Sequence, residues 1–127
     1  MKTTAIKKVQ EVVAHANGVI SAANETLAQH AKDLSGPQPK GYVMSRSWAA
    51  FTAAAQLTVW GEVLEYLTAY VIGQDSPNQE ARLGHILTTA GLRSNFAVGT
   101  GNPTVDLMAS EVQMCWMRVH IFLTQTP

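Results

Sequence analysis

The chain has 127 residues, a length that corresponds to one domain able to bury roughly 65–70% of its unfolded surface. Nine basic and nine acidic residues cancel, so the chain lacks the positive field that attracts nucleic acid or an anionic membrane, and we expect neither as a partner. Charged residues make up 14% of the sequence against a usual ~25%, which leaves little charge to cover a monomer. The composition therefore predicts a single domain, residues 1–127, that forms a homodimer.

The first predicted helix covers residues 3–34, where apolar residues recur at steps of three and four over four heptads. Lys8 lies off this stripe, and His15 follows Glu11 by one turn, so both are predicted to face solvent. Prolines in residues 35–46 predict a loop after the helix. The stripe consists of Ile6, Val9, Val13, Ala16, Ile20, Ala23, Leu27, His30 and Leu34.

The second predicted helix covers residues 47–72, with Ser45 or Ser47 as its cap. Its apolar residues fall on two seams, which predicts two packed faces and a central position. Residues 48–72 are long enough to span a membrane, but Glu62 and Glu65 near the middle would cost roughly 2–3 kcal/mol each, so we expect no span. The seams are Ala50, Ala53, Leu57, Trp60, Leu64, Leu67, Val71 and Phe51, Ala55, Val59, Val63, Tyr66, Tyr70.

Two further helices are predicted, over residues 77–92 and 103–124, separated by loops at 73–76 and 93–102. Ser76 is the expected cap of the third helix, and Pro77 suits its first position, where a missing N–H costs nothing. The fold class is therefore all-α, a four-helix bundle-like single domain with a long first helix and a largely buried second one. A short C-terminal β element is the alternative, either a strand over 119–123 or a hairpin between 96–98 and 104–107.

No catalytic motif or metal signature is present, and we expect no catalytic residue, no metal and no cofactor. Glu62 and Glu65 resemble half of a di-metal carboxylate site, but no Glu-x-x-His occurs in the chain. The single cysteine, Cys115, cannot form an internal disulfide, and no apolar leader core follows the N-terminal lysines, so the expected location is the cytoplasm.

Two candidate binding sites remain. Glu62 and Glu65 could form the polar edge of an aromatic pocket for a small apolar or cationic ligand; the plainer interpretation is a solvated stripe or an ion pair with a neighbouring helix. His30 is a separate case: a general base facing these carboxylates is the sharper interpretation, and fraying of the helix end beside Gly36 is the plainer one. Arg93 and Asn102 near a helix start could bind an anion, although a plain flexible loop explains that stretch as well. The predicted ligand-binding residues are Trp60, Glu62, Glu65, Tyr66, Tyr70 and His30.

Three classes of function follow from these patterns. The first is a non-catalytic interaction or assembly protein that self-associates through apolar helix faces. The second is a small-molecule binding protein with an aromatic pocket edged by carboxylates, and the third is a small enzyme using Glu/His acid–base chemistry. Helix spacing alone does not choose among them, because a helical bundle carries no activity of its own.

Overall fold

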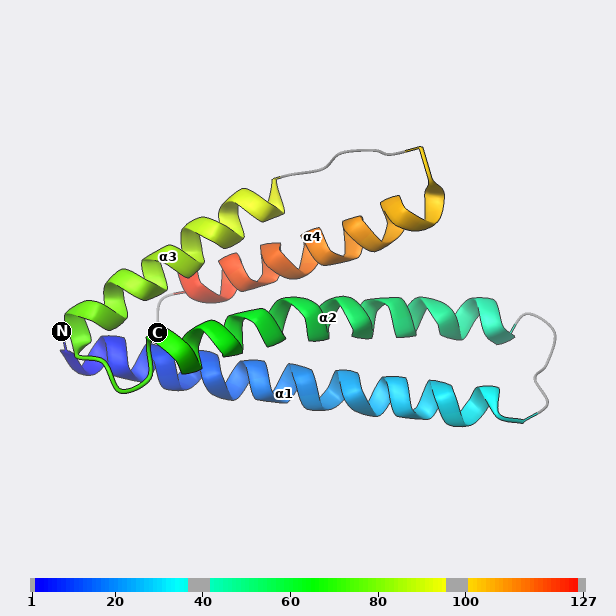
Figure 1. The fold of residues 1–127 in the computed structure, drawn as a ribbon, viewed down its shortest axis with the longest axis horizontal. Coiled ribbons are helices and arrows are strands. Elements are labelled where there is room, and N and C mark those ends of the chain that lie inside the picture. The colour runs from blue at the N-terminus through cyan, green and yellow to red at the C-terminus, as the bar shows by residue number, and fades with distance from the viewer. Residues whose placement is uncertain (1, 37–41, 96–100, 126–127) are drawn as a thin grey trace.

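The computed structural model describes residues 2–36, 42–95 and 101–125. This part of the chain forms α1 (Lys2–Leu34), α2 (Tyr42–Tyr70), α3 (Ser76–Ser94) and α4 (Pro103–Thr124), and contains no strand. α1 and α2 make a long hairpin, and α3 and α4 make a shorter one that packs on it (Figure 1). The two hairpins lie together near the N-terminus and diverge toward the start of α2. The predicted all-α, bundle-like fold is confirmed.

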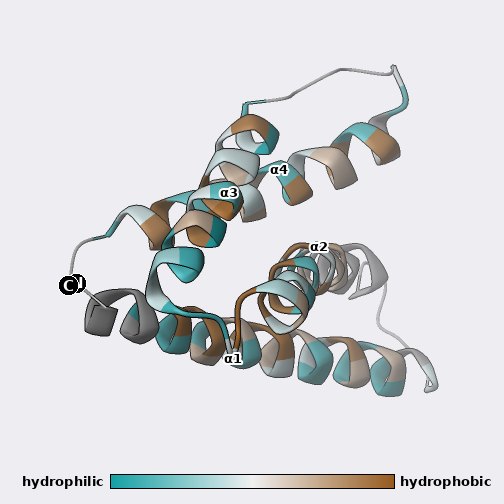
Figure 2. Cartoon of the chain, turned by 60° about the vertical axis from the view of Figure 1, so that its left-hand side comes forward, coloured by the Kyte–Doolittle hydropathy of each residue, from teal (hydrophilic) through white to brown (hydrophobic). Residues whose placement is uncertain are grey.

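α1 presents one apolar face to the rest of the bundle. Val9, Ala16 and Ala23 of the predicted stripe are buried, together with Val12 on its flank. Figure 2 shows hydrophilic and hydrophobic residues alternating along α1, as expected for a helix with one covered side. The stripe therefore identifies the face of α1 that packs against its neighbours.

α2 begins at Tyr42, five residues before the predicted start at residue 47, so the predicted loop over 35–46 is too long. Residues 42–47 contain neither proline nor glycine, and nothing in them stops the helix from extending back toward Gly41. Ser45 and Ser47 consequently lie inside the helix and do not cap it. At the other end, Gly73 has a positive φ of 88°, the left-handed conformation that lets the chain turn toward α3.

Side-chain caps begin both helices of the second hairpin. The N–H of Asn78 donates to Asp75 Oδ1 at 3.0 Å, so Asp75, and not the predicted Ser76, caps α3. The N–H of Val105 donates to Asn102 Oδ1 at 3.2 Å at the start of α4. α4 then runs through 104–107 and 119–123, so the predicted strands there are wrong, while residues 96–98 lie outside the described part of the chain.

Both predicted seams of α2 are covered within the chain over most of their length, although Tyr70 at the end of the second seam is 53% exposed. Val59, Val63 and Leu67 are buried at 0–2% exposure, and α2 packs on α1 and on α4. Burial of an aliphatic side chain of this size stabilises the fold by roughly 1.5–3 kcal/mol. Within the described residues, none of the helices has the length and apolar character needed to cross a membrane.

Lys8 and His15 join α1 to the end of α4: Lys8 is partly buried, contrary to prediction, whereas His15 is exposed as predicted but also contacts aromatic rings that the sequence does not predict. Lys8 Nζ donates to the carbonyl oxygens of Phe122 at 3.2 Å and Gln125 at 2.8 Å, where the last carbonyls of a helix need donors. The His15 ring stacks on Phe122 with centroids 4.3 Å apart and meets Trp60 edge-on at 4.7 Å. The off-stripe side of α1 therefore holds the second hairpin in place.

Candidate functional site

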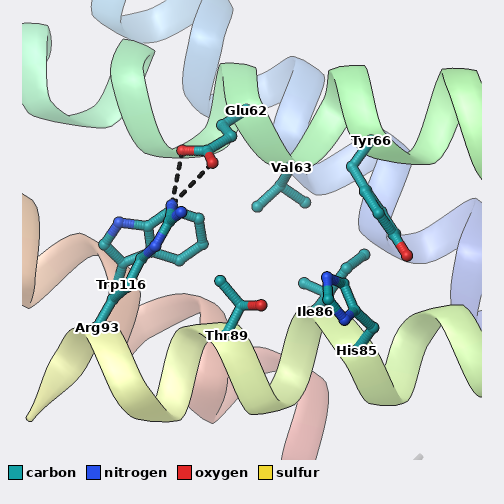
Figure 3. A pocket seen from close by; sticks show the side chains of 8 residues that line it. All are labelled: Glu62, Val63, Tyr66, His85, Ile86, Thr89, Arg93 and Trp116. Carbon is teal, nitrogen blue, oxygen red and sulfur yellow. Dashed lines mark hydrogen bonds and ion pairs between the residues drawn. The ribbon is translucent and has the colours of Figure 1, made fainter.

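A cavity of about 130 Å³, here called the α2–α3 groove, lies where α2, α3 and α4 meet (Figure 3). Its apolar residues Val63 and Ile86 belong to the buried core. The groove therefore opens directly over packed side chains. It is lined by Glu62, Val63, Tyr66, His85, Ile86, Thr89, Arg93 and Trp116.

One end of the groove is formed by an ion pair stacked on an aromatic ring. Arg93 Nη1 donates to both carboxylate oxygens of Glu62, at 2.8 and 2.9 Å. The guanidinium carbon of Arg93 lies 4.7 Å from the centre of the Trp116 ring, within cation–π range. Both charged side chains are about half exposed, at 46% and 49%, so the pair contributes about 0–1 kcal/mol to stability. Because the two charges offset each other, this end of the groove carries no net charge.

Aromatic rings form the other end. The Tyr66 ring stacks on His85 with centroids 5.3 Å apart and an interplanar angle of 25°. Tyr70 packs beside Tyr66 at 5.2 Å, and Arg82 Nη1 donates to the Tyr66 hydroxyl oxygen at 3.3 Å. The guanidinium of Arg82 also lies over the Tyr70 ring. These contacts hold Tyr66 from several sides and fix the orientation of its ring toward the groove.

Two polar side chains of α3 lie between these ends. Figure 3 shows Thr89 and His85 directed from α3 toward the groove. In the described part of the chain, neither the Thr89 hydroxyl nor the His85 ring makes a hydrogen bond. The neighbouring Thr88 differs, because its hydroxyl donates to the Gly84 carbonyl at 2.9 Å. Thr89 and His85 are therefore available to a molecule in the groove.

The structure brings together only part of the predicted ligand site. Glu62 and Tyr66 line the groove, and Arg93, predicted for a separate anion site, joins them. Trp60 is 2% exposed and packs on the side of the core that faces His15, so it belongs to the core. Glu65 is exposed and Tyr70 touches Tyr66, but neither lines the groove.

His30 and Asn102 lie elsewhere. His30 lines a separate hollow between α1 and α2 with Glu25, Asp33 and Ala49, and its Nδ1 is buried with no hydrogen-bond partner among the described residues. Asn102 serves as the cap at the start of α4. Residues 96–100 lie outside the described part of the chain, and the anion site at Arg93 and Asn102 stays a prediction.

Sequence reasoning missed three groove residues, His85, Thr89 and Trp116. His85, Thr89 and Arg93 follow one another at steps of four along α3, so they share one face. Glu62 and Tyr66 have the same spacing on α2. This pair of polar ladders was a readable signal, but only the tertiary structure shows that both ladders line one groove.

The outward side of α4 carries a second apolar seam, here called the outer strip. Its members recur at steps of three and four; Met114, Met117 and Ile121 are 45–48% exposed, and Leu107 is partly buried. On the opposite side of α4, Cys115, Trp116 and Val119 are buried. α4 therefore has two seams, of which the bundle covers one. The outer strip consists of Leu107, Ser110, Met114, Met117, Ile121 and Thr124.

Neither metal binding nor thiol chemistry has support from the geometry. No group of three or more potential ligands from His, Cys, Asp and Glu gathers anywhere in the described ranges. Cys115 is 1% exposed. Burial raises the pKa of its thiol, an effect that Arg118 opposes and Glu111 reinforces. The thiol therefore stays protonated and is a poor nucleophile.

Comparison of this chain with family models, with curated proteins and with solved structures found no match.

Proposed function

We propose that this protein is a non-catalytic interaction module that pairs with a second copy of itself through the outer strip of α4. The observation that carries the proposal is the exposure of Met114, Met117 and Ile121, at 45–48%, in one heptad-spaced line. Flexible methionine side chains adapt readily to an opposing apolar surface. The buried single cysteine agrees with a reducing cytoplasm as the place where such a module acts.

The seam that drives pairing belongs to α4, because most of both α2 seams is already buried. Both seams of α2 are covered over most of their length by helices of the same chain. The outer strip steps by 3, 4, 3, 4 and 3 from Leu107 to Thr124, the spacing at which two helices interlock side chains along a coiled coil. At ~1.5 Å of rise per residue, this seam is about 26 Å long. Over this length Leu107, Met114, Met117 and Ile121 provide apolar contacts between two copies, with the small polar residues Ser110 and Thr124 at the remaining positions.

Two charges beside the strip favour antiparallel pairing. With Leu107 and Met114 at heptad position a, Glu111 and Arg118 both occupy position e. In an antiparallel pair, position e of one helix faces position e of the other, so each Glu111 meets the Arg118 of the second copy. A parallel pair would place e opposite g, occupied by the uncharged Gln113 and by His120. The antiparallel arrangement has two-fold symmetry and forms the ion pair twice.

Substitutions of Glu111 and Arg118 test the proposed contact between the two copies. Light scattering at micromolar concentration should show a dimer for the wild type. Glu111→Lys or Arg118→Glu should each weaken dimerisation, by about tenfold, because like charges then face each other. The double variant should restore it, whereas Glu80→Lys, at an exposed position on α3, should leave it unchanged. A monomeric wild type overturns the proposal, and failure of the double variant to recover removes the e-to-e contact.

Cross-linking tests the orientation. In a Cys115→Ser background, Leu107→Cys alone should form no disulfide between copies, because the antiparallel seam places it opposite position 124. Equimolar Leu107→Cys and Thr124→Cys chains, distinguished by mass, should cross-link to each other. Self-linking of Leu107→Cys would instead show a parallel pair.

A further inference from the structure

We propose that the α2–α3 groove binds a neutral, hydroxyl-bearing single aromatic ring, a ligand of the phenol class. This inference is separate from self-association, because most of the groove residues lie on α2 and α3 and none belongs to the outer strip. The first argument is size. At about 130 Å³, the groove is close to the engineered cavity of about 150 Å³ known to hold benzene, and too small for a drug-sized molecule.

The walls suit a flat ring. Val63 and Ile86 provide apolar contacts, the Tyr66 and His85 rings form one end, and Trp116 contributes a third ring at the other. Aromatic rings prefer offset or edge-to-face contacts with one another at centroid separations of about 4.5–7 Å. A planar ligand between the two ends has aromatic side chains to contact at both, since Tyr66 and His85 lie at one end and Trp116 at the other (Figure 3). A saturated ring of the same volume has no aromatic face or edge with which to make these contacts.

The charge of the groove selects a neutral ligand. Glu62 is held by Arg93 through two short hydrogen bonds, so the carboxylate is already compensated. A cation would have to compete with Arg93 for Glu62, and an anion would have to compete with Glu62 for Arg93. Either competition exchanges one ion pair for another and leaves the displaced protein charge unpaired, so a charged ligand has no net gain. The structure therefore argues against the cationic ligand that the sequence alone allows.

The hydroxyl follows from two polar side chains of α3 that point toward the groove and make no hydrogen bond within the described part of the chain. The Thr89 hydroxyl both donates and accepts, and one nitrogen of a neutral imidazole accepts while the other donates. Among the described residues, neither side chain has a hydrogen-bond partner. A phenolic O–H can donate to one of them and accept from the other. An unsubstituted ring such as toluene leaves both without a protein or ligand partner.

Titrations followed by NMR chemical shifts of the Trp116 indole test this site. Phenol, toluene, benzoate and benzylamine should be compared at the same millimolar concentrations. We expect phenol to bind at least about fivefold more tightly than toluene, and benzoate and benzylamine to bind more weakly than phenol. Absence of phenol binding, or a preference for either charged compound, overturns the proposal.

A matched pair of substitutions assigns the hydroxyl contact. Thr89→Val keeps the shape of the side chain and should weaken phenol binding about fivefold while leaving toluene binding unchanged. Thr88→Val changes the adjacent hydroxyl, which is bonded to Gly84, and should leave both affinities unchanged. Equal loss in the two variants, or no loss in Thr89→Val, contradicts recognition by Thr89. Thermal unfolding of each variant identifies any that fails to fold, and His85→Phe then serves as the second probe of the same hydroxyl.

Discussion

α2 and α4 each carry two apolar seams, and the bundle treats them differently. On α2, the seam that includes Leu67 and the seam that includes Val59 are both buried, because α2 contacts α1 on one side and α4 on another. On α4, the seam that includes Val119 is buried, whereas the seam that includes Met117 is exposed. The two helices have similar patterns in sequence, so the pattern identifies an apolar face without saying what covers it.

The difference arises from position in the bundle. α2 packs on α1 and α4, and α4 packs on α2 and α3, but the outer strip of α4 faces away from both of its neighbours and stays exposed (Figure 1). An exposed apolar seam lowers the solubility of the protein unless another surface covers it, because the transfer of apolar surface out of water is favourable. This contrast places the proposed dimer contact on α4.

The largest expected effect comes from opening a cavity in the covered seam of α2. Leu67 is fully buried, so Leu67→Ala should lower the free energy of unfolding by roughly 2–5 kcal/mol. Leu92 is 70% exposed, and Leu92→Ala should change it by less than about 0.5 kcal/mol. Urea denaturation of both variants makes the measurement. Similar losses would show that α2 is not the packed centre.

A carboxylate on the exposed seam should affect assembly and spare the fold. Met114→Glu should weaken dimerisation by at least about thirtyfold, because a charge would be buried between two apolar seams. Met108→Glu is the control, since Met108 is equally exposed, at 45%, but lies off the outer strip. Sedimentation equilibrium measures both dissociation constants. If Met108→Glu has the larger effect, the two copies meet on a different face of α4.

The next effect concerns the lysine that joins α1 to α4. Lys8→Ala should lower the free energy of unfolding by about 0.5–1.5 kcal/mol, because two terminal carbonyls of α4 lose a charged donor. Lys32 is exposed in the last turn of α1, and Lys32→Ala should cost only a few tenths of a kcal/mol. Thermal unfolding at low and high salt compares them. Equal and small losses would indicate that Lys8 does not hold the second hairpin.

The smallest expected effect on stability is the difference between substitutions of the two central glutamates, Glu62 and Glu65. Glu62→Gln removes an exposed ion pair and should lower the free energy of unfolding by about 0–1 kcal/mol. Glu65 makes no ion pair within the described residues, and Glu65→Gln should change it by no more than a few tenths of a kcal/mol. Chemical denaturation at low ionic strength gives the best resolution. A greater loss for Glu65→Gln would contradict the pairing of Glu62 with Arg93.

Much of the local structure was predictable from sequence, because a helix is specified by residues within four positions of one another. The breaks at Gly36 and Gly73, the stripe of α1 and both seams of α2 follow from spacing and from turn residues alone. The start of α2 was misplaced because serines resemble caps even where nothing stops the helix. Asp75 took the cap of α3 because a carboxylate one residue earlier reaches the same N–H groups.

Only the tertiary structure decided which faces meet. Lys8 and His15 look solvent-facing within α1, and their contacts exist because the second hairpin folds over that side. Likewise, the sequence singled out Glu62 and Tyr66, but their partners Arg93 and His85 come from α3, some twenty to thirty residues away. Periodicity describes one helix at a time. The pairing of faces depends on long-range packing between helices, which no local pattern contains.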